Sequence, residues 1–176
     1  MPPTVDLVLE HHCAYLRPIE TSDTGRWLSY LQTDAVRQGI SWRPQSNDEL
    51  CAFVHSTDLH QPGTQVRFAI ADRSDDTLHG TVGFHSISIL HQSAEVAYDL
   101  HPDRWGQGLA TAACRAMIGW AFAQGLSRIQ ATVLADNHAS LRVLERSGFE
   151  YEGRLRKYRW VDQSARDALM YSVLRP

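Results

Sequence analysis

The stretch Trp105-Gly106-Gln107-Gly108 leads directly into Leu109-Ala110-Thr111, where small side chains with good helix propensity begin. Just before it, residues 95–100 alternate in polarity and stop at Pro102, which is typical of a strand. A turn between a strand and a helix presents free backbone N–H groups at the helix N-terminus. Glycine has no Cβ to hold a ligand away, so these amides can contact phosphate oxygens directly. The stretch therefore predicts an anion-binding loop.

Two other glycine loops fit this stretch poorly. A P-loop closes with Gly-Lys-Ser/Thr, whereas the one lysine of this chain is the distant Lys157. A dinucleotide fingerprint needs a third Gly or Ala after the second glycine and an acidic residue about twenty residues on. Thr111 and Ala131 stand at those two places. A plain helix start after a tight turn stays open as the alternative.

The segment that follows favours the anion-binding loop. A run rich in β-formers at 128–135 leads into Asn137-His138-Ala139-Ser140, and Gly148-Phe149 comes after. With these marks the chain resembles the GNAT N-acetyltransferase superfamily, and within it the ribosomal-protein N-terminal acetyltransferase (RimJ/RimL) branch. The resemblance runs from about residue 15 to residue 174. Its other marks are Leu16-Arg17-Pro18, Glu95, Tyr98, Glu152-Gly153 and Arg166-Asp167-Ala168-Leu169-Met170-Tyr171. Trp105 departs from the Arg or Gln that often begins the superfamily's loop.

The resemblance implies one N-acetyltransferase domain over residues 1–176, with acetyl-CoA as acyl donor and an amine as acceptor. It implies a layered α/β (α+β) fold: a mixed, mostly antiparallel sheet of about seven strands, helices on both faces, and a splayed strand pair at the cofactor site. Backbone amides near Leu100 would polarise the acetyl carbonyl. The cofactor-binding residues implied are Leu100, Trp105, Gly106, Gln107, Gly108, Leu109, Ala110, Thr111, Asn137 and Ser140.

Ser140 is the candidate acid, because relatives place a Ser or Tyr beside the cofactor sulfur at this position. The alternative is an ordinary first-turn helix serine that satisfies a backbone amide. Asn137 is either the cap of the same helix, a pantetheine contact, or both.

Glu95 is the candidate base. Alternation places it on the same strand face as Ala97 and Asp99, opposite Tyr98. A carboxylate there can take a proton from the ammonium group, directly or through water. The alternative is a strand-face carboxylate in solvent or paired with an arginine. Some relatives carry a glutamate at the position of Arg159, so that second route to a base is missing here.

Net charge is −3, but it divides unevenly along the chain. Residues 1–103 carry fourteen acidic and six basic side chains, and residues 104–176 carry six acidic and eleven basic ones. A basic cofactor half would attract phosphate groups, and an acidic half suits a cationic amine. Two solvated surfaces are the open alternative.

Composition argues against several other classes of protein. Hydrophobic residues make up 43% of the chain and charged residues 21%, as in ordinary globular proteins. The N-terminal residues lack the pattern of a signal peptide, no apolar run reaches the roughly 18 residues of a membrane span, and the three cysteines lack metal-ligand spacing. The nine histidines do not pair on a helix, and the arginines do not alternate with aromatics. We expect a cytoplasmic protein without metal, membrane or nucleic-acid binding.

The rest of the pattern predicts the elements that position these groups. Ser22 would cap a helix over 23–32, and the capping box of Ser46 and Glu49 would open another to about Leu59, broken by Gln61-Pro62-Gly63. Helices are also expected from 108 to about 124, ended by Gly125, and from Asn137 to Gly148. The expected strands are 13–17, 67–71, 80–89, 95–100 and 128–135, with two more around a turn at Asp162-Gln163.

Two functions stay open: an acetyltransferase, and a non-catalytic CoA-binding or regulatory module on the same fold. For the enzyme, the acceptor is a protein N-terminal amine or a small-molecule amine such as a polyamine or amino acid. Trp27, Trp42, Arg43 and Trp160 would shape the acceptor side, or the aromatics would belong to the core. A homodimer and a monomer are both compatible with the sequence.

Overall fold

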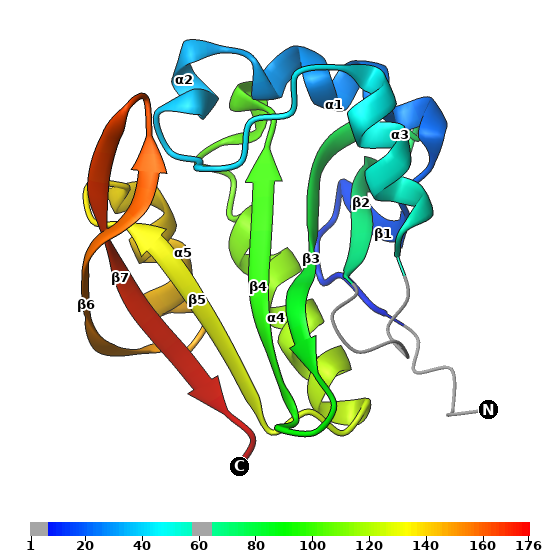
Figure 1. Ribbon diagram of the computed structural model, residues 1–176. Helices are drawn as coiled ribbons and strands as arrows, with labels where there is room; N and C mark the ends of the chain where they lie inside the picture. Colours follow the sequence, from blue (N-terminus) through cyan, green and yellow to red (C-terminus); the bar gives the residue numbers. More distant parts are fainter. Residues whose placement is uncertain (1–6, 58–64) are drawn as a thin grey trace.

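The computed structural model describes residues 7–57 and 65–176 of the chain. In that part a seven-stranded sheet has the order β1-β2-β3-β4-β5-β7-β6 (Figure 1). Neighbouring strands are antiparallel except β4 and β5, which are parallel. This confirms the predicted mixed, mostly antiparallel sheet. The strands are β1 (Ala14–Pro18), β2 (Val66–Asp72), β3 (Leu78–Ser88), β4 (Ser93–Leu100), β5 (Arg128–Leu134), β6 (Glu150–Val161) and β7 (Ser164–Leu174).

Helices cover both faces of this sheet (Figure 1). One buried cluster joins the sheet to α4 and α5, and a second joins it to α1, α2 and α3. The neighbouring residues Ala69 and Ile70 of β2 belong to different clusters, because successive strand side chains point to opposite faces. None of the described helices is long and apolar enough to cross a membrane. The helices are α1 (Thr24–Leu31), α2 (Asp34–Arg37), α3 (Asn47–His55), α4 (Leu109–Ala123) and α5 (His138–Arg146), with 3₁₀ turns η1 (Thr21–Asp23) and η2 (Pro102–Arg104).

The parallel strands β4 and β5 pair only at their beginnings. The last paired residues are Glu95 and Gln130. Beyond them β4 continues to Leu100 and β5 to Leu134 without pairing to each other, and the two strands diverge in Figure 1. The backbone of residues 96–100 therefore has no sheet partner on its β5 side. This is the splayed strand pair that the family resemblance implies.

The prediction that Ser22 caps the first helix is wrong. Glu20 and Asp23 form a reciprocal capping box around η1 instead, and the Glu20 amide donates to the Asp23 carboxylate at 2.9 Å. The same carboxylate accepts two hydrogen bonds from Arg17, both at 2.8 Å. The Asp23 carboxylate binds both the turn backbone and the half-buried guanidinium of Arg17, and so it takes the capping position that was predicted for the serine hydroxyl.

The predicted cap of α3 is confirmed in part. The Ser46 hydroxyl accepts from the Glu49 amide at 3.2 Å, but the Glu49 carboxylate accepts from the Gln45 amide at 2.8 Å rather than from Ser46. The helix ends at His55, short of the predicted Leu59. Leu59 and the predicted break at 61–63 lie outside the described residues.

The other predicted ends agree with the structure. Gly125 and Gly148 follow α4 and α5 with φ of 95° and 87°, values that only glycine adopts without strain. Asp162 and Gln163 form the predicted turn between β6 and β7. The four-residue α2 was not predicted, because one helical turn is too short to show hydrophobic periodicity.

Candidate functional site

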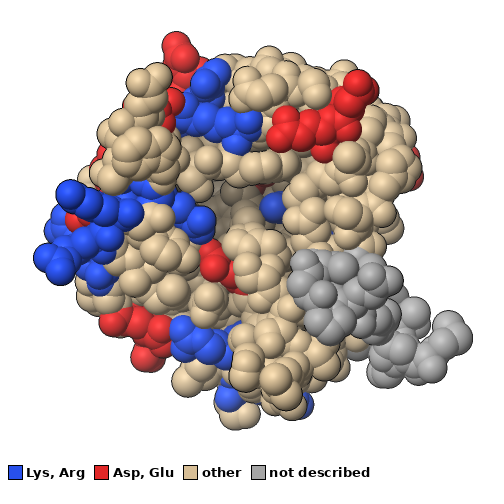
Figure 2. Space-filling view, in the orientation of Figure 1, with Lys and Arg blue, Asp and Glu red and all other residues tan. Residues whose placement is uncertain are grey.

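A cavity of about 950 Å³ lies where β4 and β5 separate. Its walls come from residues 95–100 of β4, residues 131–134 of β5, the loop before α4, and the first turns of α4 and α5. Figure 2 shows this side of the molecule hollowed near its centre, with basic and acidic side chains both visible at the hollow. We call the part around 104–111 the loop end and the part around Glu95 the charged end.

The loop end keeps backbone amides free. Gly106 and Gly108 have φ of 75° and 77°, in the left-handed region that favours glycine. Gly108 is the N-cap of α4, and no side chain caps this helix. Among the described residues none accepts a hydrogen bond from the amides of 109–111, and the space beside both glycines is open. These donors fit an anionic group such as the pyrophosphate of CoA.

Nine of the ten predicted cofactor-binding residues line the cavity. They are Leu100, Trp105, Gly106, Gly108, Leu109, Ala110, Thr111, Asn137 and Ser140. Gln107 does not line it, because its side-chain amide turns back and donates to the Asp103 carbonyl at 2.9 Å. The Trp105 indole donates to the Leu100 carbonyl at 3.0 Å and so ties the loop to the end of β4.

Besides Arg67, three arginines at the cavity wall were not singled out from the sequence: Arg104, Arg142 and Arg146. Arg142 and Arg146 are four residues apart on α5, so they share one helix face. That spacing is the sequence signal that could have identified them. Together with the free amides they supply the positive charge that binds phosphate groups.

Asn137 and Ser140 are joined by hydrogen bonds at the start of α5. The Asn137 side-chain oxygen accepts from the Ser140 amide at 3.1 Å, which confirms that Asn137 is the cap, and its amide group donates to the Gly39 carbonyl at 2.9 Å. The Ser140 hydroxyl lies 2.7 Å from the Tyr98 hydroxyl and does not satisfy a backbone amide. Burial raises the pKa of Tyr98, so this phenol stays protonated and can donate to Ser140.

Glu95 stands at the point where β4 and β5 part and is 6% exposed. Its carboxylate accepts from the Thr132 hydroxyl and from the Gln130 amide at 3.4 Å, and Arg159 lies 3.5 Å away. The predicted alternative of a pairing with arginine is therefore present in the structure. His85 Nε2 lies 3.9 Å from the same carboxylate. Burial lowers the pKa of His85, which favours the neutral imidazole.

Asp99 occupies the same strand face, as alternation predicts, and is fully enclosed by donors. Its carboxylate accepts from the Trp27 indole at 3.2 Å, the Thr81 hydroxyl at 2.8 Å and the Tyr30 hydroxyl. Burial raises the pKa of Asp99, and the charge of Arg67 opposes that rise. Each carboxylate of the charged end thus already has donors of its own.

The predicted acceptor-side residues are only partly at the cavity. Trp27 is buried in the core, and Trp42 lines the cavity while packing against Trp27 and Phe53, with ring centroids 5.6 and 4.9 Å away. Trp160 is 74% exposed on β6 and lies outside the cavity wall. Large aromatics alone therefore gave poor guidance to the acceptor side.

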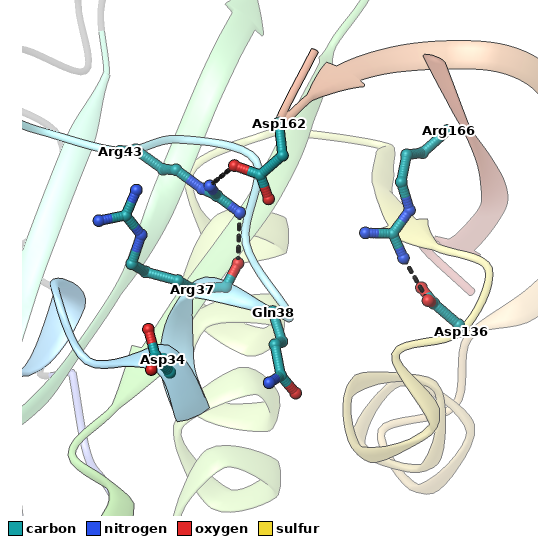
Figure 3. A pocket seen from close by; sticks show the side chains of 7 residues that line it. All are labelled: Asp34, Arg37, Gln38, Arg43, Asp136, Asp162 and Arg166. Carbon is teal, nitrogen blue, oxygen red and sulfur yellow. Dashed lines mark hydrogen bonds and ion pairs between the residues drawn. The ribbon is translucent and has the colours of Figure 1, made fainter. Parts of the chain in front are cut away.

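Arg43 lies in a second pocket, of about 560 Å³, which shares Gln38 and Asp136 with the first cavity (Figure 3). Arg43 pairs with Asp162 of the β6–β7 turn and donates to the Arg37 carbonyl at 2.8 Å. Arg166 pairs with Asp136 across the same pocket. These contacts tie the segment after α2 to the β6–β7 turn and hold that wall in place.

Known proteins are similar to this chain in sequence and in fold. Residues 14–150 match the family described as the acetyltransferase (GNAT) domain. The uncharacterised N-acetyltransferase YoaA of Bacillus subtilis is 38% identical over 96% of this chain and 97% of its own length. The ribosomal-protein-serine acetyltransferase of Escherichia coli is 30% identical over 78% of each chain. The crystal structure of the ribosomal-protein-S5-alanine acetyltransferase of Vibrio fischeri has a TM-score of 0.83 at 24% identity, covering 95% of this chain and 98% of that one.

The comparisons agree with the geometry of the site. A helix N-terminus with free amides, a strand pair that opens after three residue pairs, and a cavity between them are what a CoA-dependent acyl transfer requires. The chain therefore belongs to the GNAT acetyltransferases, enzymes that move an acetyl group from acetyl-CoA to an amine.

Proposed function

We propose that this protein binds acetyl-CoA and a primary amine together in the β4–β5 cavity and transfers the acetyl group by direct attack of the amine. One observation carries the proposal: the cavity runs without interruption from the free amides of the loop end to Glu95 and Ser140. Holding both reactants in one cavity replaces a bimolecular encounter by an oriented one.

At the loop end, the amides of 106–111 and the three arginines Arg104, Arg142 and Arg146 hold the pyrophosphate of the cofactor. When bound, acetyl-CoA supplies an activated thioester. The unpaired backbone of β4 near Leu100 supplies N–H groups for the carbonyl oxygen, where negative charge develops during transfer. Leu100 itself is 8% exposed, so this end of β4 is sheltered from water.

Ser140 donates a proton to the departing thiolate and takes up in its place the second proton that the amine nitrogen loses as the amide forms. The single proton of the Tyr98 phenol has two acceptors, the Ser140 hydroxyl oxygen at 2.7 Å and the Ser140 carbonyl at 3.2 Å, and when it is donated to the nearer one the serine hydrogen is free to point into the cavity. Tyr98 is thus a positioning residue, and the Asn137 cap fixes the first turn of α5 on which Ser140 stands. This pairing favours the acid role over that of an ordinary helix serine.

Glu95 and the neighbouring His85 take the proton that the ammonium group must lose. Both line the cavity, and the low pKa of His85 leaves its imidazole free to accept. Arg159 and Thr132 keep the carboxylate in place, because each donates toward it from the far side of the gap.

The acceptor is a protein N-terminal amine or a small-molecule amine. The Escherichia coli relative is named as a ribosomal-protein acetyltransferase, which supports the first class. Cys13, Cys51 and Cys114 are all free thiols, which supports a reducing, cytoplasmic compartment for the reaction.

A homodimer is part of the proposal. β6 is an edge strand, and it exposes Tyr151, Tyr158 and Trp160 by 56%, 48% and 74%. Such aromatics suit an interface between two copies. Light scattering tests this, because a mass near 19.9 kDa would exclude the dimer.

A steady-state assay tests the proposed reaction. The protein is supplied with acetyl-CoA and a panel of peptides, polyamines and amino acids, and both free thiol and acetylated product are measured. For at least one of these classes of amine, we expect acetylated product and free thiol to form in equal amounts. Tight CoA binding by calorimetry without product from any amine would instead identify the non-catalytic CoA-binding module.

A further inference from the structure

Arg67 is a charged side chain buried at the cavity wall, and the reaction described above does not use it. It is 7% exposed. Arg67 of β2, Gly83 of β3 and Ala97 of β4 stand side by side across the sheet. A Cβ on Gly83 would lie 2.0 Å from the Val66 carbonyl oxygen and 2.8 Å from the Arg67 Cα, so the close approach of the β2 backbone requires glycine there. The guanidinium crosses β3 and donates to the Ala97 carbonyl at 2.9 Å.

The remaining donors of Arg67 are unused. Its Nε is buried without a hydrogen-bond partner, and no carboxylate among the described residues lies within ion-pair distance of its guanidinium. The Phe53 ring, 5.5 Å from the guanidinium carbon, covers one side. A buried charge with unused donors is costly unless a ligand completes it. Arg67 therefore has the Ala97 carbonyl and the nearby charge of Asp99 but no ion-pair partner among residues 7–57 and 65–176, and it lines the cavity where a substrate binds.

The carboxylates near Arg67, unlike its guanidinium, have several hydrogen-bond partners in the protein. Asp99 accepts three hydrogen bonds from Trp27, Tyr30 and Thr81, and Glu95 is held by Thr132 and Arg159. Both carboxylates are therefore already supplied with donors by the protein, whereas the guanidinium of Arg67 has donors without an anionic acceptor. A polyamine offers only cations, and both carboxylates that it would meet here already accept hydrogen bonds from the protein. An amine that also carries an anionic oxygen finds the guanidinium of Arg67.

We propose that Arg67 binds a carboxylate carried by the acceptor, so that the amine acetylated here is the amino group of an amino acid. This inference rests on the proposed acetyl transfer. Ala97, whose carbonyl Arg67 contacts, lies on the part of β4 that has left β5 and on the same strand face as Glu95, two residues away. The anion site is therefore on the side of the gap where Glu95 takes the proton of the amine, which matches an amine and a carboxylate on one carbon. Guanidinium and carboxylate form paired, charge-assisted hydrogen bonds.

Matched pairs of acceptors test the inference. Phenylalanine and phenethylamine differ by one carboxylate, as do leucine and isopentylamine. We expect the wild-type kcat/KM to favour the amino acid by about 100-fold, the value of two hydrogen bonds to a charged group. Arg67→Gln should bring this ratio close to one. Arg67→Lys keeps the charge but loses the planar pair of donors of the guanidinium, so it should give an intermediate ratio.

Arg17→Gln is the matched control, since Arg17 is also a largely enclosed arginine, with 14% of its side chain exposed, but lines neither pocket. It should leave the ratio unchanged. Because loss of Arg67 could weaken the fold, CoA affinity and melting temperature are measured for each variant, and the wild-type ratio stands whether or not a variant folds.

Several outcomes overturn the inference while leaving the acetyl transfer intact. These are equal or better turnover of the decarboxylated amines, acetylation of peptides but not of free amino acids, and a ratio unchanged in a folded Arg67→Gln. Absence of acetylated product from every amine would instead contradict the proposed function itself.

Discussion

The loop end of the cavity relies chiefly on the backbone of one continuous segment, with arginines from η2 and α5 beside it, whereas the charged end uses side chains from five strands. Residues 106–111 present amides in a row because two glycines allow the turn. At the charged end, Arg67, His85, Glu95, Thr132 and Arg159 come from β2, β3, β4, β5 and β6 in turn. The first arrangement is local and suits a cofactor common to a family. The second depends on the whole sheet and suits discrimination among acceptors.

The largest effect is expected at the loop end, from Gly108→Val. Gly108 has φ of 77°, a conformation that costs a β-branched residue about 1–3 kcal/mol, and a side chain there would enter the open space beside the amides. We expect the KM for acetyl-CoA and the calorimetric Kd to rise about 100-fold or more from strain and lost amide contacts together. The fold should persist, because nothing packs against this position.

Gly119→Ala is the control for that substitution. Gly119 lies within α4, and an added Cβ there meets nothing within 4 Å. CoA affinity should stay as in the wild type. Unchanged cofactor binding in Gly108→Val would show that the loop does not hold the pyrophosphate.

The charged end is tested next, by Glu95→Gln. The change removes a proton acceptor at nearly constant shape, so kcat/KM should fall about 100-fold, a typical contribution of a general base. The acid limb of the pH–rate profile should disappear, since activity falls on that limb as the base becomes protonated. A limb that persists in the variant would mean that the amine's own pKa sets the profile.

Glu152→Gln is the matched control for Glu95, because Glu152 is also paired with an arginine, Arg128, but stands away from the cavity wall. Its kcat/KM should equal that of the wild type. A similar loss in both variants would point to damage of the sheet rather than to catalysis.

The loop end could be predicted from the sequence better than the charged end, because the loop is local and the charged end depends on the whole sheet. The order of strands and helices, the loop and the Asn137 cap follow from local patterns that a chain segment carries by itself. Arg67 and His85 carry no local signal, because their meaning depends on which strands become neighbours. Arg67 reaches β4 across β3, where its register neighbour is Gly83, which carries no side chain.

The acceptor side of the cavity likewise could not be predicted from local sequence patterns. The acidic balance of residues 1–103 predicts a negative cavity, yet Asp99 and Glu95 are each held by donors, and Arg67 remains unpaired among the described residues. Regional charge does not say which charges the fold pairs with one another. The wrong prediction of a Ser22 cap has a similar origin, because the Asp23 carboxylate that takes part in the capping box also accepts from Arg17.

A moderate effect is expected where the two ends meet, from Ser140→Ala. Thiolate protonation matters only as the bond breaks, so kcat should fall about tenfold, the value of one hydrogen bond to a charged group, with the KM for acetyl-CoA kept. Tyr98→Phe should give a smaller loss of kcat, because it leaves the Ser140 hydroxyl present but less well oriented. If kcat holds and only the melting temperature falls, Ser140 has a structural role alone.

The smallest effect is expected outside the cavity, at the Arg128–Glu152 pair between β5 and β6. Hydrogen bonds from Arg128 and Ser172 lower the pKa of Glu152 from 4.5 to about 2. A carboxyl whose pKa is depressed by folding stabilises the fold above its unfolded pKa, and that contribution is lost as pH falls toward the folded value. The pair is partly exposed, so we expect about 0.5 kcal/mol at neutral pH between the wild type and Glu152→Gln. Denaturant titrations should show this difference shrinking between about pH 5 and pH 2. A difference that stays constant over this range would mean that Glu152 stabilises the sheet by packing rather than by charge. Glu152→Gln would then no longer be a matched control for the loss of charge in Glu95→Gln.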